Sequence, residues 1–332
     1  MITDSTIAEG DQLGAQMGSL ASLIHIGELT GQEIAFFDEV RGAGRGMTFF
    51  HFFDVPFTIL SRDRTGFFGW CFRRLSWNYT QETVLKRLAE RRLFYRIAEP
   101  FCVVATRVLY RLVRFILYRE FKPLRFVDFS RMMEGTKRFA RDGHYDLLGR
   151  FGTYQDWRAS QLAVLRAFRF KQDVVDEARG IMRAYREQAV GEIVALGVRR
   201  ADYLFIASLN LPMDYYREAI RRFEGREVTF LVFSDDIPAC QKMPVFEGLN
   251  VLYHERASAG VDMCVMTLCD HYIVANSTFH TWGALLNPGT EKKVICPKQF
   301  VGGGDTLING RWYPDDWEAI DLSPWTKDQA NA

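Results

Sequence analysis

The sequence lacks the features that would assign it to several large protein classes. Its 332 residues contain 42 Lys and Arg against 41 Asp and Glu, a formal net charge of +1. A chain this close to neutral is not a nucleic-acid-binding protein by its overall electrostatics. No stretch reaches the roughly 20 uninterrupted apolar residues that a membrane-spanning helix needs. Residues 1–4 do not begin a basic and then apolar signal peptide, so we expect a cytoplasmic protein.

The cysteines are not arranged for metal binding. None of the six cysteines forms a Cys-x-x-Cys pair or lies near a histidine at zinc-finger spacing. The two that are closest in sequence, Cys264 and Cys269, lie in an apolar stretch, where thiols usually serve as small core residues. The pattern predicts buried, reduced thiols, which fits a reducing compartment. The six histidines are also scattered and show no metal-like clustering.

In the second half of the chain, short apolar runs alternate with segments in which apolar residues recur at helical spacing. The apolar runs predict buried strands. Strands that alternate with helices at this pitch form a parallel sheet with crossover helices, which is a Rossmann-like α/β domain. The predicted strands are residues 193–198, 228–233, 249–253, 272–275 and 294–296, and the predicted helices are 211–220, 262–269 and 276–286.

The first half is less regular. Residues 10–29 combine a turn with a helical run, and residues 33–37 predict a strand, which is a second β-loop-α start. Residues 62–125 form a basic, aromatic and mostly helical insert, with fifteen Lys or Arg against five Asp or Glu. A chain of this length exceeds one typical domain. The sequence therefore predicts two domains, 1–185 and 186–332.

Polar residues follow the first two predicted strands of the second half, at the sheet edge where ligands bind in such folds. Arg199 and Arg200 follow the first strand, and adjacent guanidinium groups suit a diphosphate because they stay charged at any working pH. The alternative is an internal salt bridge to Asp202 or Asp235. Asp235 and Asp236 follow the second strand, where carboxylates bind ribose hydroxyls, coordinate a divalent metal or simply end a solvated loop. No Asp-x-Asp pattern occurs, so we expect no metal.

Residues 276–278 lie at a strand-to-helix junction. Ser277 and Thr278 suit the start of a helix, where free N–H groups and the helix dipole favour an anion. The alternative is a plain helix cap. A phosphate that faces both this helix start and Arg199 would satisfy both features at once.

The basic insert contains arginines at helical spacing, Arg107, Arg111 and Arg114, interleaved with apolar residues. This pattern is typical of an amphipathic helix on an anionic membrane surface. The alternative is a helix that faces the core and exposes its arginines. The first interpretation predicts peripheral attachment to the inner face of a membrane.

Taken in order, these motifs resemble the bacterial α-1,2-fucosyltransferases, glycosyltransferase family 11, and more remotely the α-1,6- and protein O-fucosyltransferases. The family hallmark His-x-Arg-Arg-Gly-Asp-Tyr corresponds to residues 197–203, and its opening Gly-Leu-Gly-Asn-Gln loop corresponds to residues 12–16. The match is dense over residues 193–298. Its other motifs are Leu-Pro-x-x-Tyr-Tyr at 211–216, Phe-Ser-Asp-Asp at 233–236, Asp-x-x-x-Met-x-x-Cys at 262–269, Asn-Ser-Ser-Phe-x-x-Trp-Gly-Ala at 276–284 and Pro-Lys at 297–298.

The resemblance implies an α/β GT-B fold of two Rossmann-like domains, an acceptor-side and a donor-side one. It also implies GDP-fucose as the donor substrate, inversion at the anomeric carbon, no metal or other cofactor, and a bacterial surface glycan or lipid-linked glycan as the acceptor. Arg199 would hold the β-phosphate and offset the charge that develops on departing GDP, with support from Arg200. The other implied positions are Asp202 in the hallmark motif, Asp235 near the nucleoside, Asp262 at the guanine, Asn276, Ser277, Thr278 and Phe279 around the phosphates, and Gly14 and Gln16 in the opening loop.

Three of the departures from the family pattern matter for the interpretation. Gly197 replaces the motif histidine, which helps to hold the nucleotide in the relatives, while Ala201 replaces a glycine and Ala15 replaces the asparagine of the opening loop. Two alternatives therefore stand beside an α-1,2-fucosyltransferase: a transferase that uses another nucleotide sugar, and a non-catalytic GDP-binding or scaffold protein of the same fold. The resemblance assigns no general base.

Overall fold

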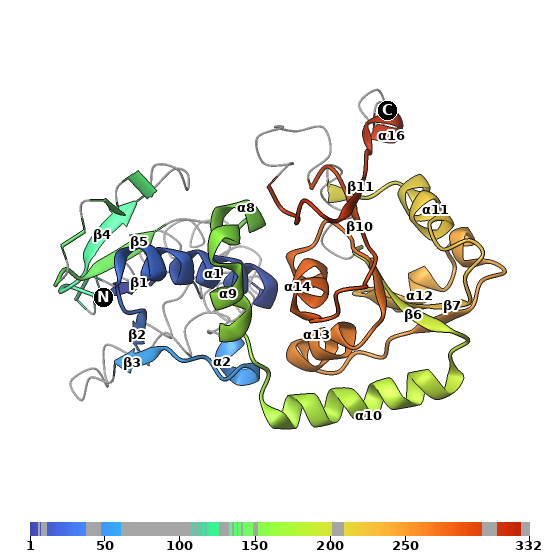
Figure 1. Ribbon diagram of the computed structural model, residues 1–332, viewed down its shortest axis with the longest axis horizontal. Coiled ribbons are helices and arrows are strands. Elements are labelled where there is room, and N and C mark those ends of the chain that lie inside the picture. Colours follow the sequence, from blue (N-terminus) through green and yellow to red (C-terminus); the bar gives the residue numbers. More distant parts are fainter. Residues whose placement is uncertain are drawn as a thin grey trace, which may run out of the picture. The chain divides into compact units, whose positions relative to one another are not determined.

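The computed structural model forms two compact units (Figure 1). It describes residues 1–5, 7, 12–37, 48–60, 118–125, 142–148, 152–200, 209–300 and 311–326, with scattered positions between 108 and 140. Unit 1 comprises residues 1–152 and 156–169, and unit 2 comprises 153–155 and 170–332. The chain thus divides at residues 169–170 rather than at the expected 185–186. The reason is that helix α10 (Gln172–Gln188) packs against α13 (Ala259–Thr267) and so belongs to unit 2.

Unit 2 is built on a six-stranded parallel sheet with the order β11-β10-β9-β6-β7-β8. Counted along the chain within this unit, the order is 3-2-1-4-5-6, which is that of the dinucleotide-binding Rossmann fold. The Rossmann-like prediction for the second half is therefore confirmed. The strands are β6 (Glu192–Val198), β7 (Val228–Ser234), β8 (Val251–Tyr253), β9 (His271–Ile273), β10 (Val294–Pro297) and β11 (Glu318–Ile320).

The central strands are continuous apolar runs because helices cover both faces of the sheet. All residues of β6 after Glu192 are buried. Helices α11 (Met213–Arg221) and α12 (Ile237–Cys240) lie on one side of the sheet, and α10, α13 and α14 (Thr278–Leu286) lie on the other (Figure 1). The core between α11 and the sheet contains Val194, Leu196, Tyr215, Tyr216, Ala219, Val232, Ile273 and Ile295.

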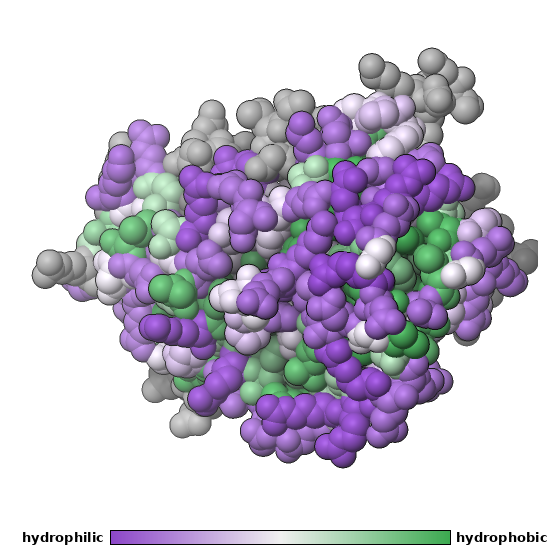
Figure 2. All heavy atoms as spheres, turned by 45° about the vertical axis from the view of Figure 1, so that its right-hand side comes forward, coloured by the Kyte–Doolittle hydropathy of each residue, from purple (hydrophilic) through white to green (hydrophobic). Residues whose placement is uncertain are grey.

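Helix α10 shows why the sequence folds as it does at the surface of unit 2. Its buried residues Val174, Ala178 and Met182 recur every fourth position, so they form one apolar stripe that packs toward α13. The remaining positions are mostly polar, and hydrophilic side chains cover the lower edge of the molecule where this helix runs (Figure 2).

Unit 1 contains a smaller set of parallel strands. Strands β1, β5 and β4 pair in that order, β2 pairs with β3, and a parallel bridge joins Ile2 of β1 to Ile34 beside β2. Helix α1 (Leu13–Thr30) is buried along most of its length, because its first charged residue is Glu28. The strands are β1 (Ile2–Thr3), β2 (Ala35–Phe37), β3 (Thr58–Leu60), β4 (Lys122–Arg125) and β5 (Tyr145–Leu148). The short helices are α2 (Phe49–Phe52), α8 (Tyr154–Trp157), η3 (Arg158–Ser160) and α9 (Gln161–Ala167) in this part of the chain, and η6 (Pro244–Phe246) and α16 (Ser323–Thr326) in unit 2.

The basic insert predicted at 62–125 lies mostly outside the described residues, as do Arg107, Arg111 and Arg114. Its last four residues form β4, which pairs in parallel with β5, so the helical prediction is wrong for that end of the insert. None of the helices in the described ranges combines the length and the apolar character needed to cross a bilayer.

The cysteines within the described ranges behave as core residues. Cys240, Cys264, Cys269 and Cys296 are buried and form no disulfide. Burial raises the pKa of the Cys264 thiol to about 11 and that of Cys296 to about 12. The prediction of buried thiols is confirmed for these four, whereas Cys71 and Cys102 lie outside the described residues.

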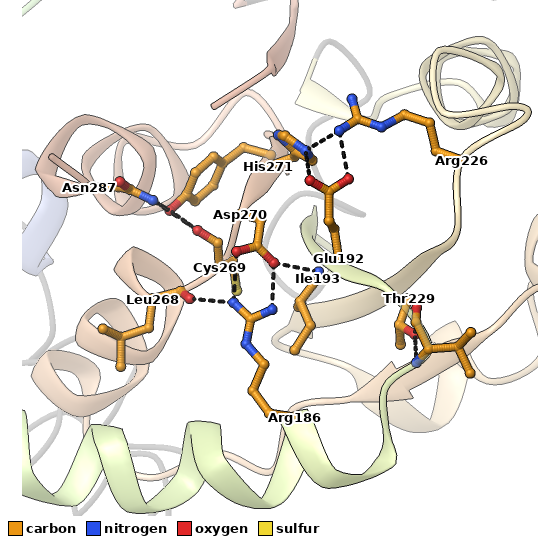
Figure 3. Close-up of polar contacts among 12 residues, drawn as sticks. Arg186, Glu192, Ile193, Arg226, Thr229, Leu268, Cys269, Asp270, His271 and Asn287 are labelled. Carbon is orange, nitrogen blue, oxygen red and sulfur yellow. Dashed lines mark hydrogen bonds and ion pairs between the residues drawn. The ribbon is translucent and has the colours of Figure 1, made fainter. Parts of the chain in front are cut away.

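A polar cluster around Asp270, at the amino edge of the sheet, ties α10 to β6 (Figure 3). The Arg186 guanidinium of α10 donates to both Asp270 carboxylate oxygens, at 2.5 and 2.8 Å, and to the Leu268 carbonyl at 3.1 Å. The Ile193 N–H donates to the same carboxylate at 2.7 Å. Burial raises the pKa of Asp270, but the hydrogen bonds from Arg186 and Ile193 outweigh burial and leave the pKa below its ordinary value.

Replacing Asp270 with asparagine is expected to lower the free energy of unfolding by about 2 kcal/mol at pH 7, because a bidentate ion pair and a charged acceptor for a backbone N–H are both lost. The pKa of Asp270 is depressed by folding, so its contribution is present above its unfolded value and is lost as the pH falls through the folded value. Chemical denaturation should therefore show the difference between Asp270→Asn and wild type shrinking below about pH 4. Asp214→Asn, which removes an exposed pair with Arg217, is the control and should cost less than about 0.5 kcal/mol.

Candidate functional site

The candidate site lies at the carboxyl edge of the unit 2 sheet, where β6 and β9 are neighbours. The chain leaves β6 toward α11 on one face and leaves β9 toward α14 on the other (Figure 1). This divergence is the topological switch point at which open α/β sheets bind ligands. Because all six strands are parallel, the three polar clusters expected from the sequence do lie on this one edge.

Arg199 and Asp235 form the central ion pair of this edge. The Arg199 Nη1 lies 2.9 Å from Asp235 Oδ2, and the two side chains are only 18% and 12% exposed. The other oxygen, Asp235 Oδ1, accepts the Arg200 N–H at 2.9 Å. The internal salt bridge considered from the sequence is therefore present. Asp235 orients the Arg199 guanidinium and fixes the start of the loop after β6.

Arg200 is held less tightly than Arg199. Its Nε lies 3.7 Å from Asp236 Oδ2, and about a third of each side chain is exposed. Asp236 also has a structural contact, because its Oδ1 accepts the Ala239 N–H at 3.2 Å and caps α12. It is thus not simply the solvated end of a loop. Asp202, predicted beside these residues, lies outside the described residues.

The start of α14 faces the same edge. Ser277 occupies the N-cap position, but its side chain makes no capping hydrogen bond, so the plain-cap alternative does not hold. The Asn276 amide donates to the Leu209 carbonyl at 2.9 Å and to the Phe300 carbonyl at 2.8 Å, which anchors the junction. Ser277 is buried, whereas Thr278 and Phe279 are partly exposed. An uncapped helix start of this kind has N–H groups oriented for an anion.

Tyr215 of α11 supports the same junction from the opposite face of the sheet. Its hydroxyl is buried and donates to the Val274 carbonyl at 2.6 Å, directly after β9. Burial raises the pKa of Tyr215 well above its ordinary value, so the hydroxyl stays a donor at any working pH. The first tyrosine of the Leu-Pro-x-x-Tyr-Tyr motif therefore has a structural role: it positions the residues that follow β9.

Asp262 lies in a buried cluster near the end of β8. Its Oδ1 lies 2.9 Å from His254 Nε2 and accepts the Ala257 N–H at 2.8 Å. On the other side of the ring, His254 Nδ1 lies 3.3 Å from the Tyr185 hydroxyl, and the ring packs against Phe233. These contacts show Asp262 shaping the loop after β8, while its role at a guanine stays a prediction.

His280 is the residue that the sequence analysis missed. It is the third residue of α14, is 4% exposed, and lies against Gly197 of β6. Burial and the nearby Arg199 charge lower the pKa of His280 to about 3, so its ring is neutral. The sequence signal that could have found it is the histidine at 280 together with the missing motif histidine at 197.

The opening-loop residues Gly14 and Gln16 lie in unit 1, in the first two turns of α1. Gln16 is fully buried, and its Oε1 accepts the Thr48 N–H at 2.9 Å and the Thr48 hydroxyl at 3.1 Å. Gln16 thus ties α1 to the start of α2, and its place at a ligand stays a prediction. Within the part of the chain that the structure describes, no group of three or more His, Cys, Asp or Glu side chains is arranged to hold a metal ion.

Comparisons with known proteins place these residues in a family context. Residues 144–303 match the model of glycosyl transferase family 11. The Escherichia coli O-antigen biosynthesis glycosyltransferase WbnK is 34% identical over 122 residues, which is 33% of this chain and 40% of that protein. The Escherichia coli alpha-1,2-colitosyltransferase is 35% identical over 103 residues, 28% of this chain and 36% of that protein. The chain thus matches well under half of the length of these relatives.

The comparison of folds covers both units. The crystal structure of POFUT1 in complex with GDP-fucose matches 88% of this chain and 96% of its own, with a TM-score of 0.50 and 9% identity. At this identity the similarity shows the fold alone. It supports the predicted GT-B architecture of parallel sheets flanked by helices. Over the residues that build the candidate site, the chain resembles glycosyl transferase family 11.

Proposed function

We propose that the protein is an inverting glycosyltransferase that moves fucose from GDP-fucose to a hydroxyl group of a glycan or lipid-linked glycan. The observation that carries this proposal is the Arg199–Asp235 pair at the switch point, on the same edge as the uncapped start of α14. The family match over residues 144–303 and the relative named as an alpha-1,2-colitosyltransferase support it.

The proposed chemistry is electrostatic. Negative charge develops on the diphosphate of the leaving GDP, and a guanidinium that is already oriented stabilises that charge without reorganisation in the transition state. Arg199 has this role, with Arg200 in support. The N–H groups of α14 and the Ser277 and Thr278 hydroxyls complete the phosphate site, and Phe279 borders it. Asp235 keeps Arg199 in place, and Asp262 lies on the side of the nucleoside.

Arg199→Ala is expected to weaken GDP binding at least about 30-fold, because charge-assisted bonds to a diphosphate contribute roughly 2 kcal/mol or more. Titration calorimetry with GDP measures this, and GDP-fucose transfer to a glycan panel should fall in parallel. Arg217→Ala removes an exposed arginine of the same unit and should leave both values unchanged.

Each other outcome of this experiment has a defined meaning. Transfer from a different GDP-sugar, with Arg199 still required, would replace fucose as the donor group. GDP binding without transfer to any acceptor would identify a non-catalytic nucleotide-binding protein. No binding of GDP by the wild-type protein would overturn the proposal.

We further propose that the reaction needs no metal, since the Arg199 guanidinium and the α14 start can balance the diphosphate charge. Transfer measured after dialysis against EDTA should therefore equal the untreated rate within about twofold. Loss of activity that added Mg²⁺ or Mn²⁺ restores would contradict this.

A separate proposal concerns the basic segment 62–125, which would contact an anionic membrane surface. Val108, Leu112 and Phe115 recur at helical spacing and are 60%, 52% and 70% exposed. The surrounding sequence carries fifteen basic residues against five acidic ones. Exposed apolar residues in a positively charged segment are the features of an interfacial helix.

The protein is accordingly expected to float with vesicles that contain anionic lipid and not with neutral ones, and salt should weaken the association. Leu112→Ser combined with Phe115→Ser should abolish flotation without changing GDP binding. Equal flotation with neutral and anionic vesicles, or none with either, would contradict the proposal.

A further inference from the structure

The ring of His280 occupies the space that a side chain at position 197 would fill. A Cβ built on Gly197 would lie 2.3 Å from His280 Nδ1 and 2.6 Å from its Cγ and Cε1, far inside contact distance. The histidine that the motif places on strand β6 is therefore replaced in space by a histidine from α14. Glycine at 197 is the residue that makes room for it.

This ring lies beside the arginine of the candidate site. Gly197 is the last residue but one of β6, and His280 lies in the first turn of α14, so the ring lies at the carboxyl edge of the sheet, where Arg199 follows β6. Burial first, and then the positive charge of Arg199, lower the pKa of His280. His280 thus belongs to the switch-point edge.

The ring also carries a buried polar nitrogen atom, Nδ1. Among the described residues, His280 Nδ1 has no hydrogen-bond partner. Buried polar atoms are nearly always paired, so an exception at the edge of a ligand site points to a partner that the protein acquires on binding. A neutral imidazole has one N–H donor and one acceptor nitrogen, which suits a phosphate oxygen or a ribose hydroxyl.

We propose that His280 is a donor-binding residue, which offers its imidazole to the nucleoside diphosphate held by Arg199 in the place that the motif assigns to residue 197. The inference rests on the proposed function, since GDP is the ligand. It accounts for the departure at Gly197: the motif histidine is not lost but has moved from the strand to the helix.

The test compares three variants by GDP calorimetry and thermal unfolding. His280→Leu fills a similar volume without a polar atom, so it should weaken GDP binding about 10-fold while leaving the melting temperature unchanged or higher. Gly197→His alone should disrupt the site, because its side chain collides with His280. The double variant Gly197→His with His280→Ala returns the imidazole to the strand and should recover GDP affinity to within about threefold of wild type.

Nuclear magnetic resonance of the wild-type protein keeps the inference testable if the double variant does not fold. The ring resonances that disappear in His280→Leu belong to His280, and GDP should shift them while the ring stays neutral. Unchanged ring resonances, or a His280→Leu variant that binds GDP within twofold of wild type, would overturn the inference.

The outcomes also separate this inference from the proposed function. If the wild-type protein does not bind GDP, the proposed function fails. If it binds GDP and Arg199→Ala abolishes binding while His280→Leu does not, the proposed function stands and only the role of His280 fails.

Discussion

Unit 2 depends on strand β6 and its two parallel neighbours. β6 pairs with β7 along its whole length and with β9 over three residues, and helices cover both of its faces. Because the chain leaves β6 and β9 toward opposite faces, the end of β6 lies at the switch point of the sheet. The candidate site follows from this arrangement: Arg199 follows β6, Asp235 follows β7 and Ser277 follows β9.

The two edges of the same sheet use charge in different ways. At the amino edge, Asp270 binds Arg186 in a bidentate pair and also accepts a backbone N–H, which stabilises the attachment of α10. The Arg199–Asp235 pair lies at the carboxyl edge, as does the uncapped start of α14. The start of this helix is a second source of positive potential. The first arrangement serves stability, and the second is suited to an anionic ligand.

The central strands of unit 2 were predictable because burial on both faces makes them continuous apolar runs. Strand β11 was missed since only Ile320 of its three residues is buried, so it carries no such run. The boundary between the domains was predicted too far along the chain. The amphipathic pattern of α10 shows that one face of the helix is buried but not which element covers that face. That element is α13, some 70 residues further along the chain, as the ranges Gln172–Gln188 and Ala259–Thr267 show.

For the candidate site, the sequence by itself determined which chemical groups follow each strand, since parallel strands carry their carboxyl ends to one edge. It could not determine that Asp235 orients Arg199 rather than standing apart from it, or that Asp262 pairs with His254. Nor could it show that His280 fills the space over Gly197. Such contacts join residues that lie on different strands and helices. They depend on how α14 and β6 pack together, and only the tertiary structure decides that packing.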